Sequence, residues 1–399
     1  MSSFARRYNG WLLALAIPVI CLLSAGAASL AVPIPDEDDF NVVQWELRHV
    51  PGKWLYLTGQ LLGGGLSREG EDERLQRFLL LSDQIRGVEV AFAAGDADEL
   101  QTLLAERDKL ENDVEAIIEG RLTAVLEEAG LESSLPLFPD ARWVFPPVDV
   151  EFDEPPRSLS ISPRSRIELI ERRPLRPGLS LDEAVEREAD VESAGDVAAL
   201  VGSLAGAATY PSIVAPVGDY RRLVSTIAHE WVHHYLFFKP LGARYYDSIQ
   251  LRTLNETVAD VAGDALAALV IERFPSPADA SEPKAEPDRT PAVDVDAFLR
   301  ELRRDVEALL TAGQIEVAEA LMEERRLELA DQGVVFRRIN QAFFAARGIY
   351  ATSPGSVDPT GEQLRTLLEQ AGGVGAFLRS AAEFKNVAQL DEALRTGGS

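Results

Sequence analysis

The chain has 399 residues, of which 46% are hydrophobic, so it is long enough for two or three packed units and can bury a substantial core. Its formal net charge of −26 at pH 7 would repel phosphate groups and argues against a surface that binds nucleic acid or anionic lipid. The single cysteine, Cys21, excludes an intramolecular disulfide and a thiolate zinc site, so any metal must be held by His, Asp or Glu.

The amino terminus combines Arg6 and Arg7 with an uncharged run over residues 8–35, and four acidic residues follow directly. That asymmetry is typical of a segment whose acidic end is translocated. The most apolar part, residues 11–23, has the length of a signal peptide, and its extension through Val32 gives 22 residues, enough to span a membrane. We expect the rest of the chain to be exported, behind either a cleaved signal or a single retained anchor.

Residues 41–131 are predicted to be helical, because leucine, valine and isoleucine recur at helix spacing between Leu100 and Ile117. Trp45, His49 and Trp54 lie in this region. They are candidates to line a site, but ordinary packing is the simpler interpretation.

The next region changes character. Short alternating runs over residues 148–152 and 166–170, broken by prolines, predict strands of a small antiparallel sheet. Ser180 followed by Glu183 has the pattern of a capping box and predicts a helix through about Leu204.

A second uncharged run covers residues 197–218, but it is rich in small residues and contains Pro211 and Pro216. We therefore favour the end of a buried helix and then a strand over residues 210–215, rather than a second membrane span.

The carboxy-terminal part begins with a change in composition. Five prolines among the eighteen residues 274–291 indicate a linker, and residues 295–330 and 361–394 have the pattern of amphipathic helices. The predicted organisation is a signal or anchor (1–35), a helical amino-terminal region (36–140), a core (141–273), a linker (274–295) and a helical carboxy-terminal region (296–399).

The segment His229-Glu230-Trp231-Val232-His233 spells HExxH within a predicted helix. Four residues make about one helical turn, so both imidazoles leave the same face and can share one metal ion. Glu230 follows the first ligand by one residue, which suits a general base that takes a proton from a water molecule polarised by the metal.

A third ligand is needed. His234 projects about 100° around the helix from His233, and His49 is distant in sequence. Glu256 is the better candidate, because it lies on a second apolar helix that runs to about Arg273. A carboxylate on such a largely buried helix would be costly without a compensating partner.

HExxH followed by the NExxAD segment over residues 255–260 resembles the gluzincins, the clan of the thermolysin-like peptidases and the zinc aminopeptidases. The resemblance covers residues 213–267 and implies one zinc ion, held by His229, His233 and Glu256, with Glu230 as general base. It also implies that Asp260 accepts a hydrogen bond from a ligand imidazole and fixes its tautomer. The fold that we expect for the whole chain is α+β and mostly helical: a zincin-like catalytic core with a small antiparallel sheet and helical flanking regions.

A donor to the oxyanion of the transition state is also required, and no histidine follows His234. Tyrosine is the natural substitute. Tyr350 is our first choice, since residues 339–350 resemble a stretch in predicted bacterial gluzincin aminopeptidases. Tyr245 and Tyr246 compete for this role, and all three can equally be core aromatics.

Residues 213–216 precede the motif helix and are either an edge strand that pairs with a peptide backbone or an ordinary buried strand.

The function expected from the motifs and the leader is hydrolysis of peptides or proteins outside the cytoplasm. The alternatives are an aminopeptidase rather than an endopeptidase, and a zinc-stabilised binding module without turnover.

Overall fold

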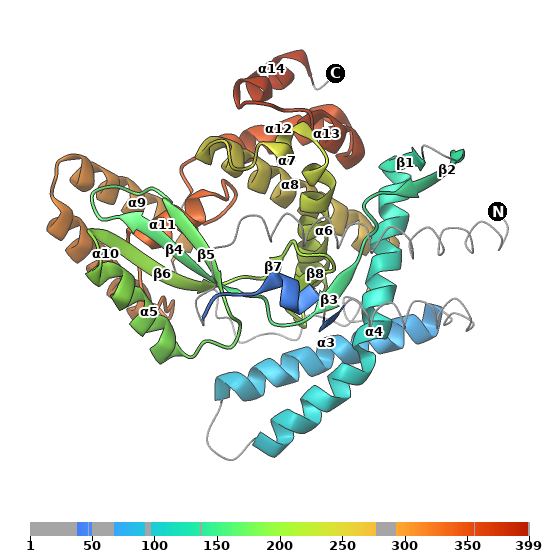
Figure 1. The fold of residues 1–399 in the computed structure, drawn as a ribbon, viewed down its shortest axis with the longest axis horizontal. Helices are drawn as coiled ribbons and strands as arrows, with labels where there is room; N and C mark the ends of the chain where they lie inside the picture. The colour runs from blue at the N-terminus through green and yellow to red at the C-terminus, as the bar shows by residue number, and fades with distance from the viewer. Residues whose placement is uncertain are drawn as a thin grey trace.

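The computed structural model describes residues 38–46, 48–49, 68–91, 97–135, 138–276, 293–354 and 356–397. Over these ranges the chain is mostly helical with small sheets, which confirms the α+β class (Figure 1). None of the helices in these ranges is both long and apolar enough to cross a membrane. The predicted leader, Trp54 and most of the predicted linker lie outside the described residues.

Two helices, α6 (Tyr220–Phe237) and α8 (Ile249–Arg273), form the centre of the molecule, with the short helix α7 (Pro240–Ala243) between them in sequence (Figure 1). The side chain of Asp219 caps α6 and that of Ser248 caps α8. Gly263 brings the two helices close together, since a Cβ at that position would lie 3.0 Å from the backbone nitrogen of His229.

Helices from both ends of the chain pack around this pair. On one side lies the hairpin of α3 (Arg68–Ala91) and α4 (Ala97–Glu128). On another side lie α12 (Thr360–Ala371), α13 (Val374–Ala381) and α14 (Ala388–Thr396) (Figure 1). These helices share one hydrophobic core with α6 and α8, to which each contributes apolar side chains, among them Phe78, Leu122, Ile227, Leu266, Leu367, Phe377 and Leu390.

A three-stranded antiparallel sheet lies beside the helix pair in the order β5 (Glu171–Leu175), β4 (Arg157–Pro163), β6 (Val197–Ser203). Successive side chains on a strand face opposite ways. Ala199 and Val201 accordingly pack on the side of α5 (Leu181–Ser193), whereas Leu200 packs in a second cluster. That cluster contains α9 (Val295–Thr311), α10 (Ile315–Asp331) and α11 (Gln341–Gly348).

Two further small sheets complete the fold. One has the order β3 (Val150–Phe152), β8 (Ser212–Val214), β7 (Gly206–Ala207), with β3 parallel and β7 antiparallel to β8. The other is the hairpin of β1 (Glu132–Leu135) and β2 (Phe138–Val144). The sheet in contact with α6 is therefore the mixed one, rather than the single antiparallel sheet that the sequence predicts.

Two predicted elements are wrong. Residues 166–170 form no strand, because no strand of the described sheets pairs with them; Ile167 and Leu169 instead pack on the region of α11. The capping box at Ser180 is present, but its helix ends at Ser193 and the chain continues as β6. The strand predicted over residues 210–215 is confirmed as β8.

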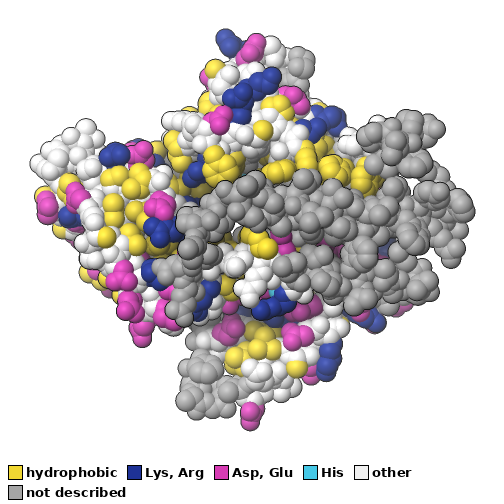
Figure 2. Space-filling view, in the orientation of Figure 1, with side chains coloured by type: hydrophobic (Ala, Val, Ile, Leu, Met, Phe, Trp, Pro, Cys, Tyr) yellow, Lys and Arg dark blue, Asp and Glu magenta, His cyan; other side chains and the backbone are white. Residues whose placement is uncertain are grey.

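On the face shown in Figure 2, acidic and basic side chains are interspersed over the described surface. Many of the charges are paired, as between Arg164 and Glu319 and between Arg176 and Glu183. The strong negative charge of the chain is thus not gathered into one patch on this face.

Candidate metal centre

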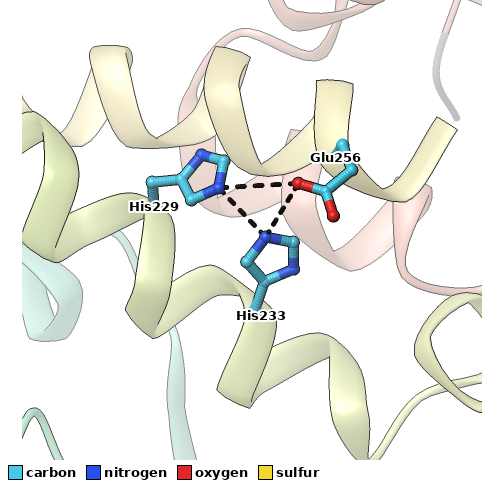
Figure 3. A group of neighbouring side chains, drawn as sticks. All are labelled: His229, His233 and Glu256. Atoms are coloured by element: carbon cyan, nitrogen blue, oxygen red, sulfur yellow. Dashed lines mark hydrogen bonds and ion pairs between the residues drawn. The ribbon is translucent and has the colours of Figure 1, made fainter. Parts of the chain in front are cut away.

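Three side chains from the central helices converge on one point (Figure 3). The Nε2 atoms of His229 and His233 on α6 are 3.0 Å apart. Oε2 of Glu256 on α8 lies 3.8 Å from Nε2 of His229 and 3.3 Å from that of His233. Among the described residues, these three form the group whose ligand atoms, all within 4.8 Å of one another, can hold a metal ion.

The other ring nitrogen of each histidine is also engaged. Nδ1 of His229 lies 2.9 Å from Oδ1 of Asp260, and Nδ1 of His233 lies 3.0 Å from Oδ1 of Asn255. Because both partners are oxygen acceptors, a proton on each Nδ1 leaves the two Nε2 atoms as the nitrogens that can bind a metal ion. Asp260 lies where the gluzincin resemblance implies. Asn255 was not predicted, although its place directly before Glu256 on a buried helix was a usable signal.

The charges of the cluster suit a cation. Burial lowers the pKa of His229, but Asp260, Glu230 and Glu256 outweigh it and raise the value to about 9. Burial raises the pKa of Glu256, but the two histidines outweigh it and lower the value to about 2. The negative charges of Asp260, Glu230 and Glu256 thus favour a positively charged group at this point. A donor set of two imidazoles and one carboxylate fits a divalent metal with an open position.

Glu230 is only 6% exposed and lines the same cavity as the three converging residues without joining them. Burial raises the pKa of its carboxyl group, against the opposing effect of the two histidines. Its neighbour across the cavity wall is Gly206 on β7, where a Cβ would lie 2.5 Å from Oε1 of Glu230. A side chain at position 206 would therefore displace the carboxylate of Glu230.

The candidate tyrosines occupy three different positions. The phenol of Tyr245 donates a short hydrogen bond to Oε1 of Glu256, and Tyr246 is 84% exposed. The ring of Tyr350 lies 6.4 Å from that of His229, centroid to centroid. Burial raises the pKa of both Tyr245 and Tyr350, and the charge of Glu256 adds to this effect. All three line the cavity.

Arg172 on β5 is a cavity residue that sequence reasoning missed. Its Nε donates a hydrogen bond of 2.8 Å to Oγ of Ser158 on the neighbouring strand β4. Its guanidinium lies near the phenol of Tyr350, and its charge opposes the rise in the pKa of that phenol that burial causes. No local pattern singles out this arginine, which lies 57 residues before His229.

The two remaining histidines stay apart from the cluster. His234 is partly buried, and the loss of hydration lowers its pKa to about 4, while its ring packs edge-on against Tyr210. His49 stacks on Trp45, and its Nδ1 lies 2.8 Å from the carbonyl oxygen of that residue. Neither is part of the metal group within the described residues.

The cavity has a volume of about 710 Å³, and its lining joins the polar cluster to apolar and aromatic side chains, among them Pro146, Leu204, Tyr210, Phe237 and Phe238. Residues Gly206 to Thr209 form another part of the wall. Strand β8 pairs with β3 on one side and β7 on the other. Of the two interpretations of residues 213–216, the buried strand therefore holds, and the edge strand at the cavity is β7.

The whole chain was compared with models of known families, with curated proteins and with solved structures, and none of them matches it. The resemblance to gluzincins therefore rests on the sequence motifs within residues 213–267 alone.

Proposed function

We propose that this protein is an exported, zinc-dependent peptidase of the gluzincin kind, which hydrolyses internal peptide bonds. The observation that carries the proposal is the convergence of His229, His233 and Glu256 beside a buried Glu230 that is left free to act on a substrate. Each of the two imidazoles is oriented from behind by a separate oxygen acceptor. Four side chains thus have the relations that metal-assisted hydrolysis requires.

One zinc ion would be held by Nε2 of His229, Nε2 of His233 and a carboxylate oxygen of Glu256. When bound, zinc supplies a Lewis acid that polarises a peptide carbonyl and lowers the pKa of water. Two imidazoles and one carboxylate, with the fourth position left open, are a donor set of catalytic zinc sites.

Glu230 acts as the proton carrier. Its carboxylate oxygen accepts a proton from the attacking water and returns it to the nitrogen of the leaving amine. Burial raises its pKa, which brings the carboxyl group closer to the working pH of a general base. Tyr350 is the candidate donor to the oxygen on which negative charge develops, because the phenol of Tyr245 is already committed to Glu256.

Strand β7 supports an extended peptide as the substrate. Its outer edge lines the cavity next to Glu230, so a substrate can add to the β3-β8-β7 sheet through main-chain hydrogen bonds. Such pairing recognises the main chain of the substrate, so it does not require a free amino or carboxyl terminus.

An aminopeptidase needs a carboxylate to hold the ammonium group of its substrate. Among the described residues that line the cavity, the carboxylates are Glu230 and Glu256, and both have other roles in the proposal. This favours internal cleavage. In a binding module without turnover, the metal site would be closed by a fourth ligand, whereas the described group has three.

Two variants of the purified full chain test the proposal. Glu230→Gln keeps the size of the side chain but loses the proton acceptor, so zinc content should stay at one ion per molecule while peptide hydrolysis falls about 10²-fold or more. Glu256→Gln weakens an anionic ligand, so zinc affinity should fall and added zinc should restore part of the activity.

Metal analysis and hydrolysis of a mixed peptide library, with the fragments identified, provide the measurements. Full hydrolysis by both variants would refute the assignment. Zinc binding in this pattern without hydrolysis by the parent would establish the binding module instead.

A further inference from the structure

Arg172 differs from the arginines around it. Arg173, the next residue on β5, forms an ion pair with Glu171, and Arg176 just beyond the strand pairs with Asp38 and Glu183. Among the described residues, no carboxylate forms an ion pair with Arg172. This is notable in a chain with 65 acidic and 39 basic residues, where a carboxylate partner is easy to supply.

The groups that Arg172 does contact are neutral. Arg172 donates to the hydroxyl of Ser158, and its charge acts on the phenol of Tyr350. A guanidinium offers five N–H donors in a planar fork, so further N–H groups of Arg172 can still donate hydrogen bonds. The charge of Glu256 acts on Arg172, but the two oxygens of Glu256 contact Tyr245 and the two histidines and form no ion pair with Arg172.

The charges of Glu256 and Glu230 act on Arg172 without an ion pair, so the remaining N–H donors of its guanidinium are available to an anionic ligand. Arg172 and Tyr350 both line the cavity of the metal cluster. Ser158, on the neighbouring strand, fixes Nε and so sets the direction of the fork. The arrangement is thus prepared for a negatively charged oxygen before any ligand arrives.

We propose that Arg172, together with Tyr350, binds a negatively charged oxygen of the substrate. The inference rests on the proposed peptidase function for the identity of the ligand as a peptide. Two oxygens of a peptide have this chemistry: the scissile carbonyl oxygen as it gains charge in the transition state, and the free α-carboxylate of a short substrate. Both would receive hydrogen bonds from the guanidinium fork.

The first measurement is independent of catalysis. Binding of N-acetylphenylalanine and of its uncharged amide to the metal-free full chain is measured by calorimetry. The parent should bind the acid about tenfold more tightly than the amide, since a charge-assisted hydrogen bond contributes about 1.4 kcal/mol or more. Arg172→Gln should abolish this difference. Arg173→Gln, on the same strand but paired with Glu171, should keep it.

Arg172→Lys is a second variant, which keeps the test valid if Arg172→Gln does not fold. It keeps the charge but loses the fork, so the preference for the acid should persist at reduced strength. If Arg172→Gln kept the full preference for the acid, or if Arg173→Gln lost it equally, the proposal would be overturned. This outcome is decided without zinc and without turnover, so it is separate from any failure of the peptidase assignment.

Kinetics of the zinc-loaded enzyme then distinguish the two sources of the anion. If the oxygen is that of the scissile carbonyl, Arg172→Gln should lower kcat about 10²-fold, with KM little changed, equally for free and amidated peptides. If it is the α-carboxylate, the variant should raise KM for free peptides and leave amidated ones unaffected. If Arg172→Gln hydrolysed free and amidated peptides with the same kcat and KM as the parent, the proposal would be overturned.

Discussion

Replacement of Gly206 by alanine tests the placement of Glu230 most directly. The new Cβ would lie 2.5 Å from Oε1, 3.0 Å from Cγ and 3.1 Å from Cδ of Glu230, whereas ordinary contacts begin at 3.4 Å. The carboxylate must therefore retreat by about 1 Å, and a misplacement of that size in a catalytic group costs about 10²-fold in rate. We expect kcat to fall by this factor.

The loss of stability should be small, because the group that moves is the end of a flexible side chain. A carboxylate turned away from its preferred rotamer costs about 1 kcal/mol. Zinc content should stay unchanged, since the three heavy atoms nearest to the new Cβ all belong to Glu230 and none to a metal ligand.

The matched control is Gly202→Ala on strand β6, where a Cβ meets nothing within 4 Å. Turnover of a cleaved peptide, zinc content and melting temperature should be measured for the parent and both variants. If Gly206→Ala kept full turnover with zinc bound, Glu230 would not be the base at this position. A loss of zinc would show instead that the substitution disturbs the ligands.

Two further predictions concern the groups around the metal. Asp260→Asn removes the anionic acceptor of His229 and should weaken zinc binding about 10- to 100-fold in competition with a chelator. Asp264, one turn further along α8 and hydrogen-bonded to Ser225, provides the control, because Asp264→Asn should leave zinc affinity unchanged. If the two variants bound zinc with equal affinity, Asp260 would have no specific role in metal binding. Tyr350→Phe should lower turnover about 10²-fold without loss of zinc, and full turnover in this variant would transfer the role of donor to Tyr245. The 84% exposed Tyr246 serves as the control, because Tyr246→Phe should leave turnover unaffected.

The parts of the site that the sequence predicts are those that local spacing determines. His229 and His233 are one turn apart, and a helix at that point is enough to place both imidazoles on one face. Glu256 and Asp260 are likewise one turn apart on a second helix. Only the packing of α6 against α8 had to be added, and the motif spacing suggested it.

The parts that could not be predicted depend on contacts between distant segments. Arg172 reaches the cavity because β5 pairs with β4, and no pattern near Arg172 reports that pairing. The uncharged run over residues 197–203 has the pattern of a buried helix end although it forms β6, because β6 is covered by helices on both faces and a short buried strand has no apolar period of its own. For the same reason β7, with two residues, left no signal.

The hydroxyl of Thr352 donates to Asp260, and Asp260 in turn accepts from His229, while the backbone nitrogen of Ala351 donates to Thr257 on the same helix α8. Tyr350 is the adjacent residue of that segment. A displacement of this turn would therefore change the position of the phenol and the basicity of a ligand imidazole at once. Turnover and metal affinity are consequently linked through a single turn of the chain. A binding event or a mutation that shifts residues 350–352 therefore acts on both, and neither property can be changed through this turn without affecting the other.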